Sequence, residues 1–346
     1  MPLFDHAPKS LCILRLSAIG DVCHVVAAVQ QIQAYWKETQ ITWIIGKTEA
    51  QLLSGLAGVN FVVYDKKSGW KGVLAVWKQL KHQRFDALLN MQTAFRASIL
   101  SLGIRAKYKI GFSAKRAREG QWLFTNRKTP EPQNPHVLDG FMAFAAYLGV
   151  PISAPHWHMP IDDIHRQAVQ QYIDPNRKNV LIAPCSSKAE KDWLPERYAQ
   201  VANWAYQHNI NVILSASTAP REQKIIEKIT ALCEFDPVNL AGKTSLKELT
   251  ALIGMVDLVI SPDSAAAHIA TSQNTPVIGL YAYHNPLRTG PYNNLTDVIS
   301  VYEQNAIKEF GQPSSKLAWA TKLKGKNLMS EISVNDVITH MQKWLS

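Results

Sequence analysis

One short segment, LRLSAIGDV at residues 14–22, has a carboxylate between a strand-like run and a helix-like run. Asp21 stands where a helix N-cap belongs, and a capping carboxylate stabilises a helix by about 1 kcal/mol. The carboxyl end of a strand is also where open α/β folds bind ligands, so Asp21 could act as a general base. Both interpretations stay open on this segment alone. Because Gly20 is its only glycine, the segment lacks the G-x-G-x-x-G pattern of dinucleotide-binding folds.

Two later segments favour binding of an anion such as phosphate. The segment APCSSKAEKDWLP at residues 183–195 offers hydroxyl and ammonium groups directly after a predicted strand. The segment VISPDSAAAHIA at residues 259–270 ends a strand and opens a helix near Asp263 or Ser264, where backbone N–H groups and the helix dipole attract negative charge. His268 lies one turn after Ser264 and could face the same ligand. The alternative, a capping residue and a packed histidine, stays open.

Alternating apolar runs and helical periodicity supply the scaffold for these segments. The alternation is interrupted at residues 151–178, which are rich in proline, and it restarts at Val180. The order is that of βαβ units and predicts mostly parallel sheets with helices on both faces, an α/β fold. Strands are predicted at 11–16, 41–45, 61–64, 87–91, 108–111, 180–183, 211–215, 258–260 and 276–280, and helices at 22–36, 73–81, 136–148, 196–207, 221–232, 246–255, 265–272 and 334–345.

Composition restricts the class of protein. At about 150 residues per domain, a chain of 346 residues suggests roughly two domains. Hydrophobic residues make up 47% and charged residues 18%, as in globular proteins. The cysteines are scattered without a C-x-x-C pair, which excludes a disulfide scaffold and argues against a cysteine zinc site. No apolar stretch approaches the roughly 18 residues of a membrane span, and we expect no export signal.

The excess positive charge lies in the first half of the chain. Residues 1–155 contain 19 Lys and Arg against 9 Asp and Glu, whereas residues 156–346 contain 18 of each. Residues 105–128 alone contain eight basic residues against one acid, Glu119. This asymmetry suggests that the first half meets something anionic, although a solvated basic surface is the simpler alternative. On charge alone, nucleic acid, an anionic membrane and an acidic small substrate remain open.

Several segments follow one another in an order that points to a known family. They are LRLSAIGDVCH, DALLNMQTAFRAS, AREGQWLFTNRK, APCSSKAEKDWLP, ASTAPREQ and SPDSAAAHIATSQNTPVIGLY, followed by TGPY. Together they extend from residue 14 to residue 292. The chain resembles glycosyltransferase family 9, the heptosyltransferases of lipopolysaccharide inner-core synthesis. The AREG…NRK segment is most similar to the heptosyltransferase I branch, which acts on Kdo-lipid A.

The resemblance implies a GT-B fold, in which two Rossmann-like domains face each other across a cleft. We expect an acceptor-binding domain at residues 1–155, a nucleotide-sugar-binding domain at 156–330, and a C-terminal helix at 331–346 that packs back on the first domain. The implied reaction is an inverting, metal-independent transfer of heptose from ADP-L-glycero-D-manno-heptose to Kdo of Kdo-lipid A, without a cofactor. The implied location is cytoplasmic and peripheral on the anionic face of the inner membrane, with no nucleic acid partner. Without a hydrophobic anchor, we expect salt to reverse membrane association.

The family's functional positions fall on named residues of this chain. The catalytic base falls on Asp21, which would remove a proton from a Kdo hydroxyl. Donor-binding positions fall on Ser186, Ser187, Lys191, Glu222, Thr244, Asp263, Ser264 and His268, and acceptor-binding positions on Gln92, Arg96 and Arg118. Two departures stand out: Ala265 replaces the family's usual glycine, and Gly120 replaces its commoner proline.

Three alternatives compete with this interpretation. A relative that transfers a later inner-core heptose has the same motifs. An NAD(P)-dependent oxidoreductase on a Rossmann fold is disfavoured by the missing glycine pattern. A nucleic-acid-binding protein is suggested only by the net charge of +10, without a recognition motif. The number and phosphorylation of Kdo units in the acceptor stay open.

Overall fold

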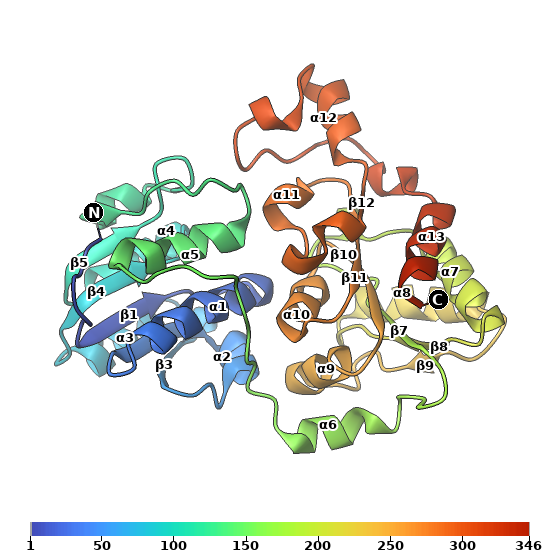
Figure 1. Ribbon diagram of the computed structural model, residues 1–346, viewed down its shortest axis with the longest axis horizontal. Coiled ribbons are helices and arrows are strands. Elements are labelled where there is room, and N and C mark those ends of the chain that lie inside the picture. Colours follow the sequence, from blue (N-terminus) through green and yellow to red (C-terminus); the bar gives the residue numbers. More distant parts are fainter. Residues whose placement is uncertain (1, 346) are drawn as a thin grey trace. The chain divides into compact units, whose positions relative to one another are not determined.

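The computed structural model describes residues 2–345, which form two compact units, one ending at Pro160 and one beginning at Ile161 (Figure 1). Each unit contains a six-stranded sheet whose paired strands are all parallel. The strand orders are β3-β2-β1-β4-β5-β6 and β12-β11-β10-β7-β8-β9. Both are doubly wound orders, with a topological switch point between β1 and β4 and between β7 and β10. The predicted α/β class with two Rossmann-like sheets is confirmed.

The first sheet is covered by helices on both faces. Alternate side chains of β1 point to opposite faces, and Cys12 and Leu14 pack with residues of α3 and α4. Helix α1 lies beside α5 (Figure 1). The strands are β1 (Ser10–Leu14), β2 (Gln40–Gly46), β3 (Val59–Tyr64), β4 (Phe85–Asn90), β5 (Ala106–Gly111) and β6 (Arg127–Lys128). The helices are α1 (Ile19–Tyr35), α2 (Lys47–Leu53), α3 (Gly69–Leu80), α4 (Phe95–Leu102) and α5 (Val137–Leu148), with 3₁₀ turns η1 (Lys66–Ser68) and η2 (Gln121–Phe124).

The second sheet has the same arrangement. Helices α7, α8, α12 and α13 contribute to one core with β7, β8, β10 and β11, and α10 packs on α9. The strands are β7 (Asn179–Ile182), β8 (Asn211–Leu214), β9 (Val238–Asn239), β10 (Leu258–Pro262), β11 (Val277–Tyr281) and β12 (Val298–Ser300). The helices are α6 (Asp163–Gln170), α7 (Pro195–Gln207), α8 (Pro220–Leu232), α9 (Leu246–Ile253), α10 (Ala265–Gln273), α11 (Pro286–Thr289), α12 (Tyr302–Phe310) and α13 (Val334–Leu345), with 3₁₀ turns η3 (Ala189–Lys191), η4 (Tyr292–Asp297), η5 (Ser314–Lys316) and η6 (Leu328–Glu331).

The structure differs from the sequence-based expectation mainly in short elements. The sequence did not predict helices α2, α4, α6, α11 and α12 or strands β6, β9 and β12, whose few residues carry little periodicity. Helix α6 lies inside the stretch expected to be an irregular connection and packs on α9. Helix α1 begins at Ile19 with Ala18 at its N-cap, so Asp21 is the third residue of the helix and not its cap.

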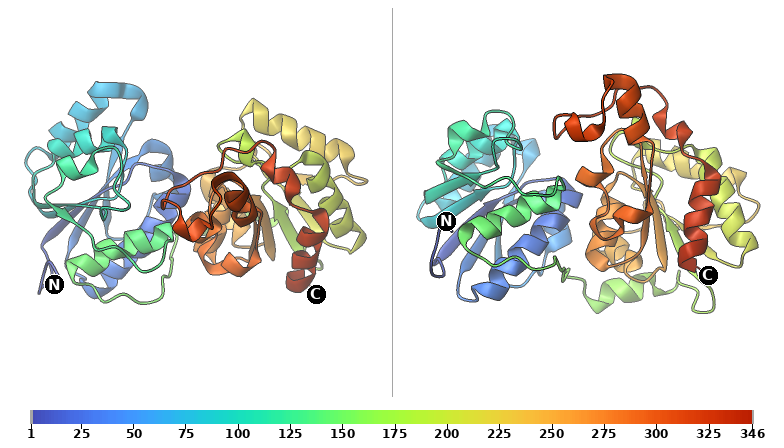
Figure 2. Two further views of the ribbon diagram at one scale, coloured as in Figure 1. Left: turned by 90° about the horizontal axis from the view of Figure 1, so that it is seen from above. Right: turned by 45° about the horizontal axis from the view of Figure 1, so that its top comes forward.

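The C-terminal helix belongs to the second unit. We expected residues 331–346 to pack on the first domain, but Val337 and Met341 of α13 are fully buried in the core of the second unit. There α13 packs on α7, and Figure 2 shows the two helices together. The stretch before α13, near Ile332, joins the same core. In residues 2–345, no helix is long and apolar enough to cross a membrane.

Candidate functional site

At the switch point of the first sheet, Asp21 is paired with a buried arginine. Arg15 follows β1 and donates from Nη2 to Asp21 Oδ2 and from Nη1 to the backbone oxygen of Met91, 2.6 Å away. The side chains of Arg15 and Asp21 are 10% and 31% exposed. Burial lowers the pKa of Arg15, and the charge of Asp21 opposes that shift. One Asp21 oxygen is therefore held by Arg15, and the carboxylate keeps access to solvent.

Gln92 follows β4 and joins the ends of the two central strands. Its Oε1 accepts hydrogen bonds from the backbone N–H groups of Leu16 (3.1 Å) and Ser17 (3.3 Å). Gln121, which is buried, donates to the backbone oxygens of Asn90 (2.8 Å) and Gln92 (3.2 Å). Gln92 thus fixes the turn that precedes Asp21, and its side-chain oxygen is occupied.

A cavity of about 610 Å³ opens at the carboxyl ends of β1, β3 and β4. We call it the Trp70 pocket, after an indole that is 64% exposed. The Tyr64 side chain is 1% exposed, and within residues 2–345 its hydroxyl has no hydrogen-bond partner. Aromatic walls and two cations suit a sugar with an acidic group. The lining residues used below are Ser17, Tyr64, Lys66, Trp70, Phe95 and Arg96.

The basic stretch at residues 105–128 contains exposed cations and also cations whose charged groups bond to other parts of the first unit. Arg118 is exposed in the loop after β5. Arg116 is instead 2% exposed and donates to Glu131 (3.0 Å) and to the backbone oxygen of His136 (2.8 Å). Lys109 Nζ donates to the backbone oxygen of Ser101 at the end of α4 (2.8 Å), and partial burial lowers its pKa. Lys109 is therefore a helix-capping residue, not one of the exposed cations.

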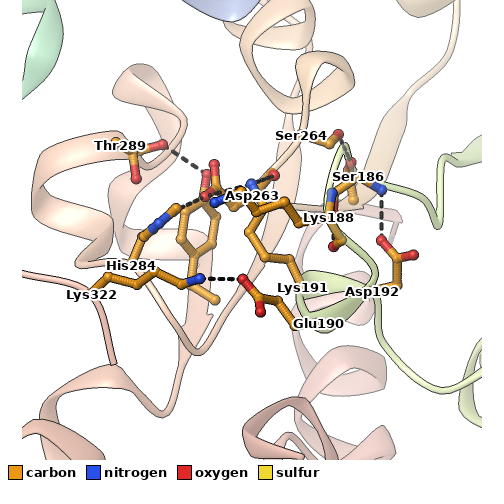
Figure 3. A network of polar contacts seen from close by, with 12 residues as sticks. Ser186, Lys188, Glu190, Lys191, Asp192, Asp263, Ser264, His284, Thr289 and Lys322 are labelled. Atoms are coloured by element: carbon orange, nitrogen blue, oxygen red, sulfur yellow. Dashed lines mark hydrogen bonds and ion pairs between the residues drawn. The ribbon is translucent and has the colours of Figure 1, made fainter. Parts of the chain in front are cut away.

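In the second unit, the ends of β7, β10 and β11 bring Lys191, Asp263 and His284 together (Figure 3). Lys191 Nζ donates to Asp263 Oδ2 (3.0 Å) and to the backbone oxygen of Asp263 (2.7 Å). The His284 Nδ1 atom lies 2.5 Å from the same Oδ2 atom. Because an ammonium group has three N–H donors, these contacts leave one donor of Lys191 for an anionic ligand.

Burial and neighbouring charges have opposite effects on the pKa of the Asp263 carboxyl. Burial alone would raise the pKa of this carboxyl, but the His284 hydrogen bond and the charges of Lys191, His284 and His268 hold it well below its usual range. Ser264 is the N-cap of α10, and its Oγ accepts from the Ala266 N–H (3.2 Å). Expectations that α10 opens at Ala265 and that a residue of this turn caps it are confirmed. The α10 N-terminus thus adds a favourable dipole for an anion next to Lys191.

The loop after β7 uses Ser186 for its own folding. The buried Ser186 donates from Oγ to the Lys188 backbone oxygen (2.7 Å) and from its N–H to Asp192 (2.6 Å). Asp192 also pairs with Arg221. Burial raises the pKa of Asp192, although its hydrogen bonds and Arg221 oppose the shift. Ser187 is exposed at the tip of the loop and is the hydroxyl available to a ligand.

Glu222 and Thr244 lie at two further loops of the same sheet edge. Glu222 is in the first turn of α8, and its Oε2 accepts from the Ser217 N–H (2.8 Å). Its Oε1 lies 3.6 Å from Arg221 Nη2, which leaves lone pairs for hydroxyl groups. Thr244 is half-buried between β9 and α9, one residue before the confirmed capping box of Ser245 and Glu248.

A second cavity, of about 1060 Å³, lies beside this loop. Its lining includes Glu190 and Arg221, the sequence neighbours of Lys191 and Glu222, together with Trp193 and Lys322. Lys322 pairs with Glu190 (Figure 3). In residues 2–345, no group of three or more His, Cys, Asp and Glu side chains could hold a metal ion. The positive charge near Asp263 comes from side chains and a helix end.

The structure thus groups the predicted residues within each unit. Asp21, Gln92 and Arg96 lie at the sheet edge of the first unit, where Arg15 holds the Asp21 carboxylate and Gln121 holds the backbone of Gln92. Sequence reasoning missed His284, although it lies only four residues after the predicted strand 276–280 of a parallel sheet, which was a usable signal. It also missed Arg15 and Tyr64, because each stands in an apolar strand-like segment that reads as core.

Comparisons with known proteins agree on one family. The sequence signature described as glycosyltransferase family 9 (heptosyltransferase) matches residues 73–320. The chain is 68% identical to the lipopolysaccharide core heptosyltransferase OpsX of Haemophilus influenzae over 99% of both chains. It is similar in fold to a family 9 glycosyltransferase of Veillonella parvula, with a TM-score of 0.81 at 20% identity over 99% of this chain and 98% of that one.

A structure of the Escherichia coli heptosyltransferase WaaC with ADP has the same fold, with a TM-score of 0.73 at 19% identity over 96% of this chain and 99% of that one. The fold shared with these two structures confirms the predicted GT-B fold class. This family assignment takes the place of the two alternative interpretations, an oxidoreductase and a nucleic-acid-binding protein. The chain belongs to glycosyltransferase family 9, the heptosyltransferases.

Proposed function

We propose that this enzyme transfers L-glycero-D-manno-heptose from ADP-heptose to Kdo of Kdo-lipid A in lipopolysaccharide inner-core synthesis. The observation that carries the proposal is the 68% identity to a lipopolysaccharide core heptosyltransferase over 99% of both chains. The WaaC structure of the same fold was solved with ADP, which supports an ADP-linked donor. The donor binds the second unit and the acceptor binds the first.

The donor's diphosphate binds between Lys191 and the N-terminus of α10. Lys191 has two donors committed to Asp263, at 2.7 and 3.0 Å, and its third donor reaches a phosphate oxygen. Asp263 and His284 act as positioning residues that fix the ammonium group. Ser187, Ser264 and His268 line the same anion site, and Ser186 shapes its loop. As the bond from heptose to phosphate breaks, Lys191 and the helix end stabilise the charge on ADP without a metal ion.

The adenosine of the donor extends toward Glu222 and Thr244. Glu222 accepts hydrogen bonds from the ribose hydroxyls, since one of its oxygens is fixed by the Ser217 N–H and the other keeps free lone pairs. Thr244 lines the adenosine from the loop before α9. The Ala265 side chain, which replaces a glycine of the family pattern, borders the phosphate site at the first residue of α10.

Asp21 is the general base. A Kdo hydroxyl attacks the anomeric carbon of heptose from the face opposite ADP, and its proton passes to the Asp21 carboxylate. The new glycosidic bond forms as the bond to the phosphate oxygen breaks, so one base is enough and the configuration is inverted. Arg15 holds one carboxylate oxygen and leaves the other for the proton. This arrangement supports a base of fixed position.

The acceptor binds at the Trp70 pocket and the neighbouring basic loop. The aromatic walls stack on a sugar ring, and Arg96 and Lys66 pair with carboxylate or phosphate. Arg118, exposed beyond the pocket, adds a further cation. Gln92 contributes by holding the turn between β1 and Asp21. This site is cytoplasmic and works at the inner membrane surface, where lipid A is anchored.

The second candidate is transfer of a later inner-core heptose. The test is transfer of labelled heptose from ADP-heptose to purified Kdo-lipid A, with heptosylated core as a competing acceptor. We expect heptose to be transferred to Kdo-lipid A. The rates measured with acceptors that carry one Kdo unit, two Kdo units or a phosphorylated Kdo unit then rank these acceptors. Product on heptosylated core alone would favour the second candidate.

A further inference from the structure

The 3₁₀ turn η2 exposes two large apolar side chains in succession. Trp122 is 63% exposed and Leu123 is 76% exposed. An isolated exposed apolar side chain is ordinary, but an adjacent pair at the tip of a turn forms a small protruding surface. We call Trp122 and Leu123 the η2 tip.

The residues on either side of the η2 tip, Gln121 and Phe124, are fixed by contacts with the rest of the first unit. The Gln121 side chain is fully buried, donates to the Asn90 backbone oxygen (2.8 Å) and accepts from the Phe112 N–H (3.0 Å). The rings of Phe124 and Phe95 meet edge to face at 5.9 Å between centroids. The side chains before and after the tip are thus anchored, while the tip itself points to solvent.

A glycine makes this turn possible. Gly120 precedes η2 with a φ of +71°, in the left-handed region. Proline, the commoner residue of the family pattern here, is fixed near φ −65° and cannot adopt this conformation. Gly120 therefore lets the backbone enter η2 in a conformation that the commoner proline would not allow.

The surroundings of the η2 tip are basic. Exposed cations flank it in sequence on both sides, and they are Lys115, Arg118, Arg127 and Lys128. The one acid in the stretch, Glu119, accepts a hydrogen bond from the Phe95 N–H (2.7 Å) and caps α4. Exposed apolar side chains flanked in sequence by exposed cations complement a membrane, which is anionic at its surface and apolar inside.

We propose that the η2 tip inserts into the interfacial layer of an anionic lipid membrane. The Trp122 indole and the Leu123 side chain lie among the glycerol and first acyl carbons, and the flanking cations meet lipid phosphates. A second copy of this chain is a poorer occupant, because two basic surfaces repel each other. The inference rests on the proposed membrane-anchored acceptor. It differs from the expectation of an association that has no hydrophobic anchor and is reversed by salt, and the two are distinguished by binding at high salt.

The first test is co-sedimentation of the full chain with vesicles of phosphatidylglycerol and phosphatidylethanolamine that contain no lipopolysaccharide. At about 1 M salt, where the Debye length is about 3 Å, electrostatic attraction is screened and apolar insertion remains. We expect Trp122→Ala/Leu123→Ala to lower the partition coefficient by at least about tenfold under these conditions. The matched control is Tyr206→Ala/Leu232→Ala, whose side chains are each 48% exposed on the second unit.

The second test is quenching of tryptophan fluorescence by brominated lipids in the same vesicles. We expect Trp122→Phe to remove most of the lipid-dependent quenching although only one of ten tryptophans is lost. Wild-type chain that fails to bind vesicles, or a Trp122→Phe variant that is quenched normally, would overturn the proposal. A tip variant that changes the sedimentation mass without lipid would reassign the tip to self-association. Heptose transfer is a separate readout, so failure of the proposed function is distinguishable from failure of this inference.

Discussion

Replacing Lys191 by methionine removes one positive charge from a site where the ammonium group contacts both the side chain and the backbone oxygen of Asp263. The side chains of Lys191 and Asp263 are 11% and 12% exposed, so solvent replaces the lost ammonium group poorly. The variant leaves Asp263 with His284 and keeps most of the aliphatic volume of the lysine. The change therefore isolates the ammonium group.

The magnitude follows from the one donor that Lys191 has available for a phosphate oxygen. A charge-assisted hydrogen bond contributes about 1.5–3 kcal/mol, which corresponds to a loss of about 10- to 100-fold in ADP affinity. Adenosine carries no phosphate, and its affinity should change little. The unfolding free energy should also fall, by about 3 kcal/mol, because a buried carboxylate loses a partner.

The assay is calorimetric titration of ADP and adenosine into wild type, Lys191→Met and Lys188→Met, at a temperature where each is folded. Lys188 is exposed on the same loop, so its variant has the same change in net charge. We expect ADP binding by Lys188→Met to fall by less than about threefold, as for a solvent-screened charge. Equal losses of ADP and adenosine affinity in Lys191→Met would refute the phosphate contact.

Three further outcomes are expected. Turnover should survive EDTA, because Lys191 and the α10 N-terminus supply the positive charge; a strict divalent-metal requirement in steady-state assays would contradict this. Arg118→Ala should raise the acceptor KM or lower kcat and leave the donor KM unchanged, and normal acceptor kinetics would remove Arg118 from the acceptor site. Folding lowers the pKa of Asp263, so its carboxylate stabilises the fold above the unfolded-state pKa of about 4, and this stabilisation is lost as the pH falls below that value. Asp263→Asn should therefore flatten the pH dependence of the unfolding free energy in acid, measured by urea unfolding, and an unchanged slope would count against the pKa shift.

The sheets and the strand ends that carry the site were predictable because they depend on local pattern. Apolar strands alternate with amphipathic helices, and parallel strands align their carboxyl ends at one edge. Asp21, Lys191 and Asp263 each follow a predicted strand, so their location at an edge needs no tertiary information. The capping box of Ser245 and Glu248 was predictable for the same reason, since the two residues lie within one helical turn.

The partners of these residues were not predictable, because they depend on how distant segments meet. His284 lies 21 residues after Asp263 and reaches it only through the register of β10 with β11. Ser186 was expected to bind donor, yet its hydroxyl closes its own loop, which a sequence pattern cannot distinguish. Arg15 lies among apolar residues of the sequence, and its contacts with Asp21, the Met91 backbone oxygen and the Phe141 ring all come from segments that meet only in the fold.

The central proposal, a heptosyltransferase in which Asp21 is the base, is tested most directly by one rate measurement. Heptose transfer from ADP-heptose to Kdo-lipid A is followed for wild type and Asp21→Asn, with ADP affinity measured on the same samples. We expect the variant to be slower by about 100-fold or more, with ADP affinity nearly unchanged, because only proton removal is lost. Turnover near the wild-type rate would reduce Asp21 to a residue that orders the first turn of α1 and would contradict the proposed mechanism.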